Sequence, residues 1–197
     1  MKTLRQLFCI ALLLACNLVQ AKATLSVAPP SKPVAVGDTI EVFVMVANAN
    51  DLFGFQFDFM FDQTVFAAQS VTQGSFLPNH GNTLFVPGTI DNDEGIVSFN
   101  ASTLLGQGRG AKGDGILLAF SFTAISAGTA AFSIVAPVLL NSALNVLPFT
   151  STVAMVTVSP IPEPATYLLL LIGLAGLGGF KRFCSGRRAG ELANTGS

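Results

Sequence analysis

Phenylalanine occupies every odd position from 53 to 61, and the side chains between these rings are small, polar or flexible. Successive side chains of a β-strand point to opposite faces, so this segment predicts a strand with one solidly aromatic face. Burying each ring contributes about 1.5 to 3 kcal/mol. We therefore expect segment 53–61 to be a central core strand whose outward positions include Gln56 and Asp58.

The same alternation recurs in shorter segments between residues 24 and 159. In residues 40–46 and 116–122, apolar side chains occupy every second position. Further strand-like segments cover residues 25–27, 65–71, 83–86, 96–101, 130–135 and 154–158, and turn residues separate them, for example at 48–51. About nine short strands without a helical period predict an all-β sandwich.

The first 23 residues predict a secretory signal peptide. Two basic residues precede the apolar run 7–15, and Ala21 and Ala23 offer small side chains for cleavage. The run has about half of the roughly 20 residues that a membrane-spanning helix needs. Two alternatives stay open, namely a retained membrane anchor and acylation of Cys16 at the end of a lipobox-like sequence.

Residues 167–180 are apolar throughout, and four basic residues follow within eight positions. This pattern predicts a short transmembrane helix whose basic end lies inside the cell. At 1.5 Å per residue the run reaches about 21 Å, whereas the hydrocarbon core of a bilayer is about 30 Å thick. A helix this short is better suited to temporary than to permanent anchoring.

Segment 24–159 carries three basic and nine acidic side chains, a net charge of −6. Nucleic acids are polyanions, so they are not the expected ligand. The segment contains no cysteine, and His80 is the one histidine of the chain. The segment therefore lacks a thiolate nucleophile, and a lone loop histidine is solvated far more often than it is catalytic, so we expect no enzymatic activity.

Two loop sequences could bind a ligand, and each has a simpler interpretation. The glycine-rich stretch 106–115 lacks the helix that a phosphate loop needs, which favours a flexible loop closing in an Asp-Gly turn. Asp91, Asp93 and Glu94 offer oxygen ligands for Ca²⁺, but their surroundings do not fit an EF-hand loop. Such residues are also typical of tight turns, so a structural turn is favoured over a calcium site.

Five motifs follow one another in a characteristic order, at residues 36–42, 54–62, 74–77, 95–99 and 113–122. Their succession resembles the cohesin domain over residues 24–158. The resemblance implies a jelly-roll β-sandwich that serves as a receptor for dockerin modules.

In cohesins, the partner sits on the outer face of the sheet that contains the strand matched by segment 53–61. The resemblance therefore assigns partner binding to Gln56 and Asp58, and to Ser98 and Asn100 on a neighbouring strand that is expected to face the same way. No structural role is expected for Asp58, because an exposed carboxylate has little interaction to lose. Direct binding of an extracellular polysaccharide stays open, although segment 24–159 lacks the Trp and Tyr residues on which sugars usually stack.

Pro162, Glu163 and Pro164 precede the apolar run, and Lys181 and Arg182 follow it. This order resembles a PEP-CTERM sorting signal, which an exosortase processes in Gram-negative bacteria that make exopolysaccharide. Such signals usually end soon after their basic residues, and the further tail departs from that pattern. The resemblance implies transient membrane anchoring, followed by release to the cell surface or extracellular matrix.

The chain is thus expected to comprise a signal peptide (1–23), a cohesin-like sandwich (24–159), a sorting signal (160–188) and a tail (189–197). We expect it to act as an exported, non-catalytic binding or scaffolding module for a dockerin-like protein. The alternative is a carbohydrate-binding or structural component of the polysaccharide matrix.

The mature protein should lack both ends, because the signal peptide is cleaved on export and the short span is suited to removal. Intact-mass measurement on protein extracted from the cell surface should detect neither the residues before Thr24 nor the span. Recovery of residues 167–197 in that material would contradict the interpretation as a sorting signal.

Overall fold

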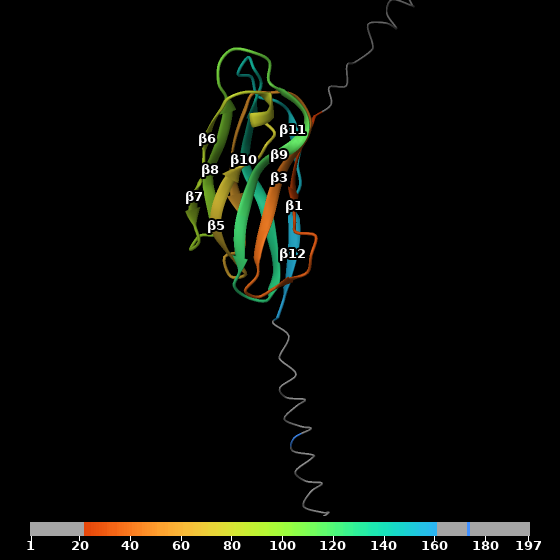
Figure 1. Ribbon diagram of the computed structural model, residues 1–197, viewed down its shortest axis with the longest axis vertical. Coiled ribbons are helices and arrows are strands. Elements are labelled where there is room, and N and C mark those ends of the chain that lie inside the picture. The colour runs from red at the N-terminus through yellow and green to blue at the C-terminus, as the bar shows by residue number, and fades with distance from the viewer. Residues whose placement is uncertain (1–21, 161–172, 174–197) are drawn as a thin grey trace, which may run out of the picture. The chain divides into compact units, whose positions relative to one another are not determined.

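The computed structural model describes residues 22–160 and 173. Residues 22–160 form twelve strands and one short 3-10 helix, η1 (Pro78–His80), which confirms the predicted all-β sandwich (Figure 1). Residues 1–21 of the predicted signal peptide, including Cys16, the sorting signal after Pro160 other than Gly173, and the tail lie outside the described residues. Ala23, which the sequence assigns to the signal peptide, is the first residue of β1. Among those that are described, we find no helix with the length and apolar character needed to cross a membrane.

Most strands are longer than the sequence predicts, and there are more of them; β4 is shorter than segment 53–61, and β6 has its predicted bounds. Three strands that were not predicted, β2, β7 and β11, are only two or three residues long. The bounds are β1 Ala23–Ala28, β2 Val34–Ala35, β3 Thr39–Leu52, β4 Gly54–Met60, β5 Phe66–Gln73, β6 Thr83–Val86, β7 Thr89–Asp91, β8 Ile96–Leu104, β9 Ala111–Ala124, β10 Gly128–Leu140, β11 Phe149–Ser151 and β12 Ala154–Ser159.

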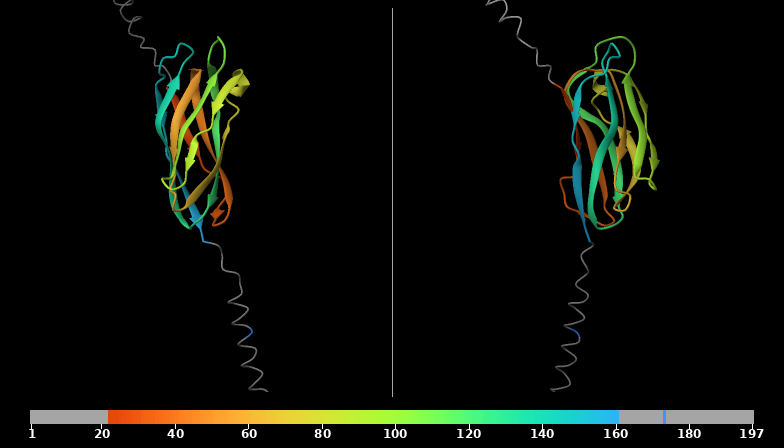
Figure 2. Two further views of the ribbon diagram at one scale, coloured as in Figure 1. Left: turned by 90° about the vertical axis from the view of Figure 1, so that its left-hand side faces the viewer. Right: turned by 180° about the vertical axis from the view of Figure 1, so that it is seen from behind.

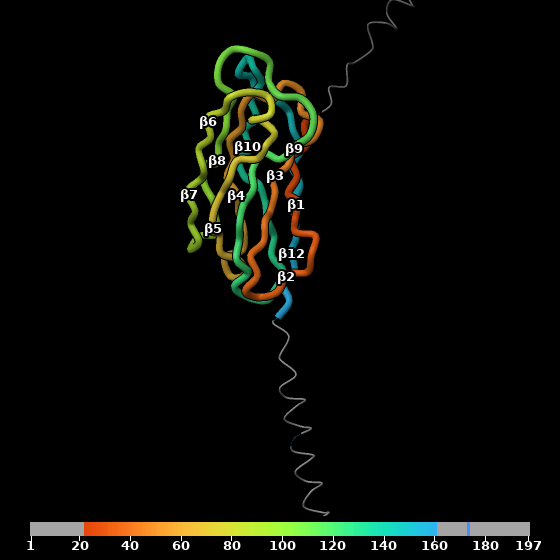
Figure 3. The backbone as a smooth tube through the Cα atoms, viewed as in Figure 1, coloured from red at the N-terminus to blue at the C-terminus, as the bar shows by residue number. Residues whose placement is uncertain are grey.

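These strands form two sheets. The first has the order β11-β1-β3-β9-β5, and the second has the order β2-β12-β10-β4-β8-β6, with β7 also paired to β8. The strands run along the length of the sandwich, so the connecting loops gather at its two ends (Figure 2). β4 pairs with β10 and β8 in the middle of the second sheet, as segment 53–61 predicts. β1 begins at one end of the sandwich and β12 finishes at the other (Figure 3).

Phenylalanine rings from both sheets meet in the core. The buried rings of β4 and its C-terminal flank are those of Phe55, Phe57, Phe59 and Phe61. Phe59 stacks on Phe120 of β9 with ring centroids 4.2 Å apart, and Phe122 of β9 lies 4.9 Å from Phe132 of β10. Aromatic pairs in such arrangements contribute about 0.5 to 1.5 kcal/mol each beyond the burial of their area. These contacts hold the two sheets together.

β3 and β9 continue past their predicted ends. The predicted turn 48–51 is instead the last part of β3, which stays paired to β9 through three register shifts. Asn48 and Asp51 have positive φ values of 55° and 73°, so they bend the strand without ending it. The prediction of one flexible loop over 106–115 is also wrong, because β9 begins within it and the Asp114 carboxylate accepts a hydrogen bond of 2.7 Å from the N–H of Asn48.

The Asp51 carboxylate joins three segments at this end of the sandwich. Its Oδ1 accepts a hydrogen bond of 2.6 Å from the N–H of Gly110, and its Oδ2 accepts bonds of 3.3 and 2.8 Å from the N–H and hydroxyl of Ser142. Burial raises the pKa of Asp51, but these hydrogen bonds and the charge of Lys112 outweigh burial and hold the pKa below its ordinary value. A Cβ at Gly110 would lie 2.5 Å from the backbone carbonyl carbon of Asp51, so this approach requires glycine.

Side chains from the second sheet close the free edge of β5. The side-chain amide of Asn92, in the β7–β8 turn, accepts a hydrogen bond of 2.7 Å from the N–H of Ala68 and donates one of 3.1 Å to the carbonyl oxygen of Ala68. Farther along β5, Gln73 donates to the hydroxyl of Ser102 at 2.7 Å and accepts from that of Thr83 at 3.2 Å. These side chains thereby connect the first sheet to the second at this edge.

Phe57→Ala should lower the free energy of unfolding by about 3 to 5 kcal/mol, because loss of a buried ring removes its contacts and leaves a cavity. Phe57 has 0% exposure, whereas Gln56 is half-buried on the opposite side of β4. Gln56→Ala should therefore cost far less. Urea denaturation of both variants measures the difference, and the opposite ranking would mean that the two faces of β4 are exchanged.

Candidate functional site

The outer face of the second sheet carries two adjacent rows of residues that cross four strands. In the order β10, β4, β8, β6, one row is Val138, Gln56, Ala101 and Val86, and the next is Leu140, Gly54, Thr103 and Leu84. Only Gln56 and Thr103 are polar in these rows. A sheet face turned toward solvent normally carries mostly polar side chains, so this face is unusual.

Several large apolar side chains of this face remain exposed. Their exposed fractions are 55% for Leu84, 39% for Val86, 59% for Phe99 and 37% for Val138. Together with Gln56 and Leu140 they line an open depression of about 340 Å³, which we call the apolar groove. Contiguous exposed apolar surface of this kind is typical of a site that another molecule covers.

Phe99 reaches the groove because β8 contains a β-bulge at this residue. The register between β8 and β4 shifts between Phe57 and Phe59, and Phe99 has a φ of 59°. This left-handed conformation costs a non-glycine residue about 1 to 3 kcal/mol, so surrounding contacts must stabilise it. One such contact is the hydrogen bond of 2.7 Å that the N–H of Phe99 donates to Oδ1 of Asp58.

Asn100 supports the same bulge from the core side. Its side chain is completely buried, and Nδ2 donates hydrogen bonds of 2.7 Å to the carbonyl oxygen of Val97 and 3.3 Å to that of Phe57. Among the described residues, Oδ1 of Asn100 has no hydrogen-bond partner. A Cβ at Gly88, in the break between β6 and β7, would lie 2.5 Å from this oxygen, so glycine at position 88 leaves the room that Asn100 needs.

The predicted partner-binding residues separate into two groups. Gln56, Asp58 and Ser98 are half-buried on the outer side of the sheet, and Gln56 lines the groove. The prediction that Asn100 faces the same way is wrong, because the bulge inserts one residue after Ser98 and turns Asn100 inward. The expectation that Asp58 has no structural role is also wrong, since its carboxylate holds Phe99.

The sequence pattern does not reveal the apolar residues of the groove. Simple alternation over 96–101 places Phe99 inside, and only the bulge brings it to the surface. On β6, Leu84 and Val86 alternate with the partly buried Phe85, but all three are apolar, so the pattern does not distinguish the inner face from the outer. Leu84 and Val86 are two positions apart, so a strand places both side chains on the same face. This spacing is the one sequence signal that could have grouped them.

The acidic turn does not form the calcium site considered from the sequence. Oδ1 of Asp91 accepts hydrogen bonds of 3.0 Å from the N–H groups of both Asp93 and Glu94, as in a tight turn. Within residues 22–160, no three His, Cys, Asp or Glu side chains are grouped so that they could hold a metal ion. Asp91 therefore stabilises the turn, and Asp93 and Glu94 are exposed.

Two other polar groups stabilise turns. Hydrogen bonds of 2.6 and 2.9 Å from the hydroxyl and N–H of Thr64 lower the pKa of Asp62 in the β4–β5 turn. Nδ1 of His80 lies 2.8 Å from the carbonyl oxygen of Phe76, and the two rings are 5.3 Å apart. These contacts give both groups a structural function.

A family model for the cohesin domain matches residues 23–147. The chain belongs to the cohesin domain family. Cohesin domains are non-catalytic binding modules, and this one presents its apolar groove on the sheet that contains β4. No curated protein matches the sequence.

Solved cohesin structures share the fold of this chain. A non-cellulosomal cohesin from the hyperthermophilic archaeon Archaeoglobus fulgidus is 18% identical, with a TM-score of 0.58 over 75% of this chain and 96% of that one. A type II cohesin from the cellulosome of Acetivibrio cellulolyticus is 14% identical, with a TM-score of 0.59 over 69% of this chain and 95% of that one. A type I cohesin–dockerin complex from Clostridium thermocellum gives 14% identity and a TM-score of 0.57, over 71% of this chain and 100% of that one.

A model of the PEP-CTERM protein-sorting motif matches residues 160–188, which confirms the sorting signal recognised from Pro162, Glu163, Pro164, Lys181 and Arg182. The motif implies an exported protein that an exosortase processes in a Gram-negative bacterium. The cohesin domain and the sorting motif together make the chain a secreted cohesin-like module.

Asp58→Ala should destabilise the domain by about 0.5 to 1.5 kcal/mol, because it removes the solvent-exposed hydrogen bond that the N–H of Phe99 donates to the carboxylate. Asp58→Asn should recover part of the loss, since the amide oxygen can still accept this bond. Asp93→Ala is the matched control, because Asp93 is an exposed carboxylate in a turn, and its denaturation midpoint should match that of the wild type. Equal midpoints for Asp58→Ala and Asp93→Ala would contradict the assigned role of Asp58.

Proposed function

We propose that this protein is an exported scaffolding module that docks a dockerin-like protein on the outer face of β10, β4, β8 and β6. The observation that carries the proposal is the apolar groove, in which Phe99 and Leu84 expose more than half of their surface. Covering apolar area of this kind contributes about 25 cal/mol per Å².

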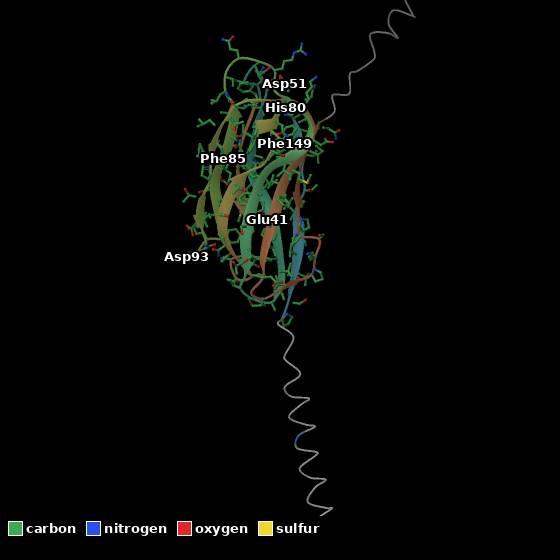
Figure 4. The ribbon with its side chains drawn as sticks, in the orientation of Figure 1. Glu41, Asp51, His80, Phe85, Asp93 and Phe149 are labelled. Carbon is green, nitrogen blue, oxygen red and sulfur yellow. The ribbon has the colours of Figure 1, made fainter. Side chains whose placement is uncertain are left out.

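The outer face of the first sheet exposes less apolar surface along β3 than the second sheet exposes at the groove. Of the outward residues Glu41, Phe43 and Met45 of β3, only Glu41 is exposed, and the two apolar side chains are half-buried. Glu41 of β3 is labelled in Figure 4, on the outer side of the first sheet. The contrast between the two faces favours the second sheet as the surface that a protein partner covers.

Phe99 is the central contact in this proposal. Interface energy is concentrated in a few large side chains, and aromatic residues are enriched among them. The bulge holds the ring of Phe99 outward through Asp58 and Asn100, so little side-chain or backbone order has to be gained on binding. Gln56 contributes polar contacts from within the groove, and Ser98 contributes them beside Phe99.

Two comparisons support the proposal. One similar structure is itself a type I cohesin–dockerin complex, and the sorting motif is that of an exported protein. We infer that the mature module acts at the cell surface or in the extracellular matrix, where it gathers proteins that carry dockerin-like segments.

Phe99→Asn tests the proposal without disturbing the bulge, because Asn tolerates the left-handed conformation better than Phe. Wild type, Phe99→Asn and the opposite-face control Glu41→Lys are immobilised and exposed to an extract of the native organism. A dockerin-like protein should be captured by wild type and by Glu41→Lys, and its affinity for Phe99→Asn should fall about 30-fold or more.

Two results would contradict the proposal. One is capture of the same proteins by all three domains. The other is retention of the isolated domain on exopolysaccharide, equally with and without Phe99, which would favour the matrix-binding alternative.

A further inference from the structure

β6 is the end strand of the second sheet, and its outer edge forms a border of the sandwich, at the left in Figure 1. The N–H of Leu105 donates a hydrogen bond of 2.8 Å to the carbonyl oxygen of Asn82, so the even-numbered residues of β6 bond to β8. The odd-numbered residues, Thr83 and Phe85, therefore turn their N–H and C=O groups toward the free edge.

The pairing of β8 with β4 gives the same result. The N–H of Leu104 donates a hydrogen bond of 2.8 Å to the carbonyl oxygen of Phe53, so the even-numbered residues from 100 to 104 bond to β4. The odd-numbered residue Thr103 then bonds to β6, where its partner is Leu84. The free edge of β6 thus presents two N–H groups and two C=O groups.

These backbone groups are uncovered, in contrast to those of β5. In the part of the chain that the structure describes, no side chain forms a hydrogen bond with them, whereas Asn92 bonds to both backbone groups of Ala68. The edge also lacks charges, because residues 63–90 contain no Asp, Glu, Lys or Arg. Natural edge strands are usually blocked by charged side chains or bulges, so β6 is unusual in being free to pair.

We propose that β6 pairs antiparallel with β6 of a second copy, and that the mature module is a reversible dimer. With Leu84 on the two-fold axis, Thr83 of each copy lies opposite Phe85 of the other, and their free groups form four backbone hydrogen bonds. The second sheets of the two copies then form one continuous sheet. This inference does not rest on the proposed docking function.

The edge is complementary to itself in its side chains as well. A two-fold axis brings each residue near it close to its own equivalent, so a charged side chain there would meet a like charge. Leu84 occupies this position and is 55% exposed. Opposite residues in a non-hydrogen-bonded pair have Cα atoms about 4.5 Å apart, so the two Leu84 side chains cover each other.

The pairing ends at two copies. Pro87 directly follows β6 and has no N–H, so the ladder cannot continue past it. A two-fold interface uses the same edge of both copies and leaves neither free. Four hydrogen bonds and one pair of leucines make a small interface compared with the roughly 1,200 to 2,000 Å² that stable complexes bury, so the dimer forms at high local concentration.

The dimer also joins the two apolar grooves. Leu84 belongs to the outward row that crosses the second sheet, and this row continues across the axis into the row of the second copy. Both grooves face the same side of the continuous sheet. A partner with two docking segments can therefore bind both copies at once.

Disulfide trapping tests the register. All core residues lie between Ala23 and Val158, so domain 22–160 folds by itself, and it contains no cysteine. In Leu84→Cys the two Cα atoms lie on either side of the axis, at a separation near the about 4.4 to 6.8 Å that a disulfide needs. In the matched control Val86→Cys they are at least about 13 Å apart, at 3.4 Å per residue. Air oxidation should link Leu84→Cys into dimers and leave Val86→Cys unlinked.

A proline substitution tests the backbone hydrogen bonds. Thr83→Pro removes the outward N–H of each copy, and so two of the four bonds, but no bond to β8. Thr83→Val is the matched control, because it loses the same hydroxyl bond to Gln73 and keeps the N–H. In sedimentation equilibrium, wild type and Thr83→Val should dimerise equally, and Thr83→Pro about tenfold more weakly or worse.

Hydrogen exchange identifies the edge directly. The amides of Thr83 and Phe85 should become protected as the protein concentration rises, whereas those of Leu84 and Val86 should be protected at every concentration. Wild type that stays monomeric up to about 1 mM, or equal cross-linking of the two cysteine variants, would overturn the dimer. Loss of the dimer in Phe99→Asn would also overturn it, because the copies would then meet through their grooves. The docking function is tested separately, by capture of a partner.

Discussion

The packing of phenylalanine rings between the two sheets determines which side chains the second sheet presents on its outer face. Phe59 of β4 stacks on Phe120 of β9 at 4.2 Å, and the other buried rings of β4 are fixed in the same register. A slip of one residue would move these rings to solvent, so the register of β4 cannot change without loss of the core. Gln56 and Asp58 are therefore held on the outer face by the same packing that stabilises the sandwich.

The apolar groove depends on a local departure from that regular pattern. A residue with a left-handed backbone is costly, yet Phe99 adopts this conformation between a carboxylate outside the sheet and a buried amide inside it. Asp58 and Asn100 are both placed by strands whose register the core fixes. The exposed ring is thus positioned by the rigid sheet, as preorganised binding requires.

The sequence predicts the regular parts of this fold and fails at its bulges. The alternation of phenylalanine in 53–61 is a local signal, and it identifies the central strand. The bulge at Phe99 depends on Asp58, 41 residues away, and on the space that Gly88 leaves, so neighbouring residues do not reveal it. The sequence predicts a turn at Asn48 and Asp51 for a similar reason. Their types suit left-handed conformations in turns and bulges alike, and only pairing with β9 distinguishes the two.

The hydrogen bonds of Asn92 bear on whether copies of the protein can aggregate through their edge strands. An uncovered edge strand is a template on which a second chain can add its own strand, and repeated addition produces fibrils. The side-chain amide of Asn92 already occupies both polar backbone groups of Ala68 on β5. A second chain that approaches β5 at Ala68 therefore finds no free backbone group there with which to pair.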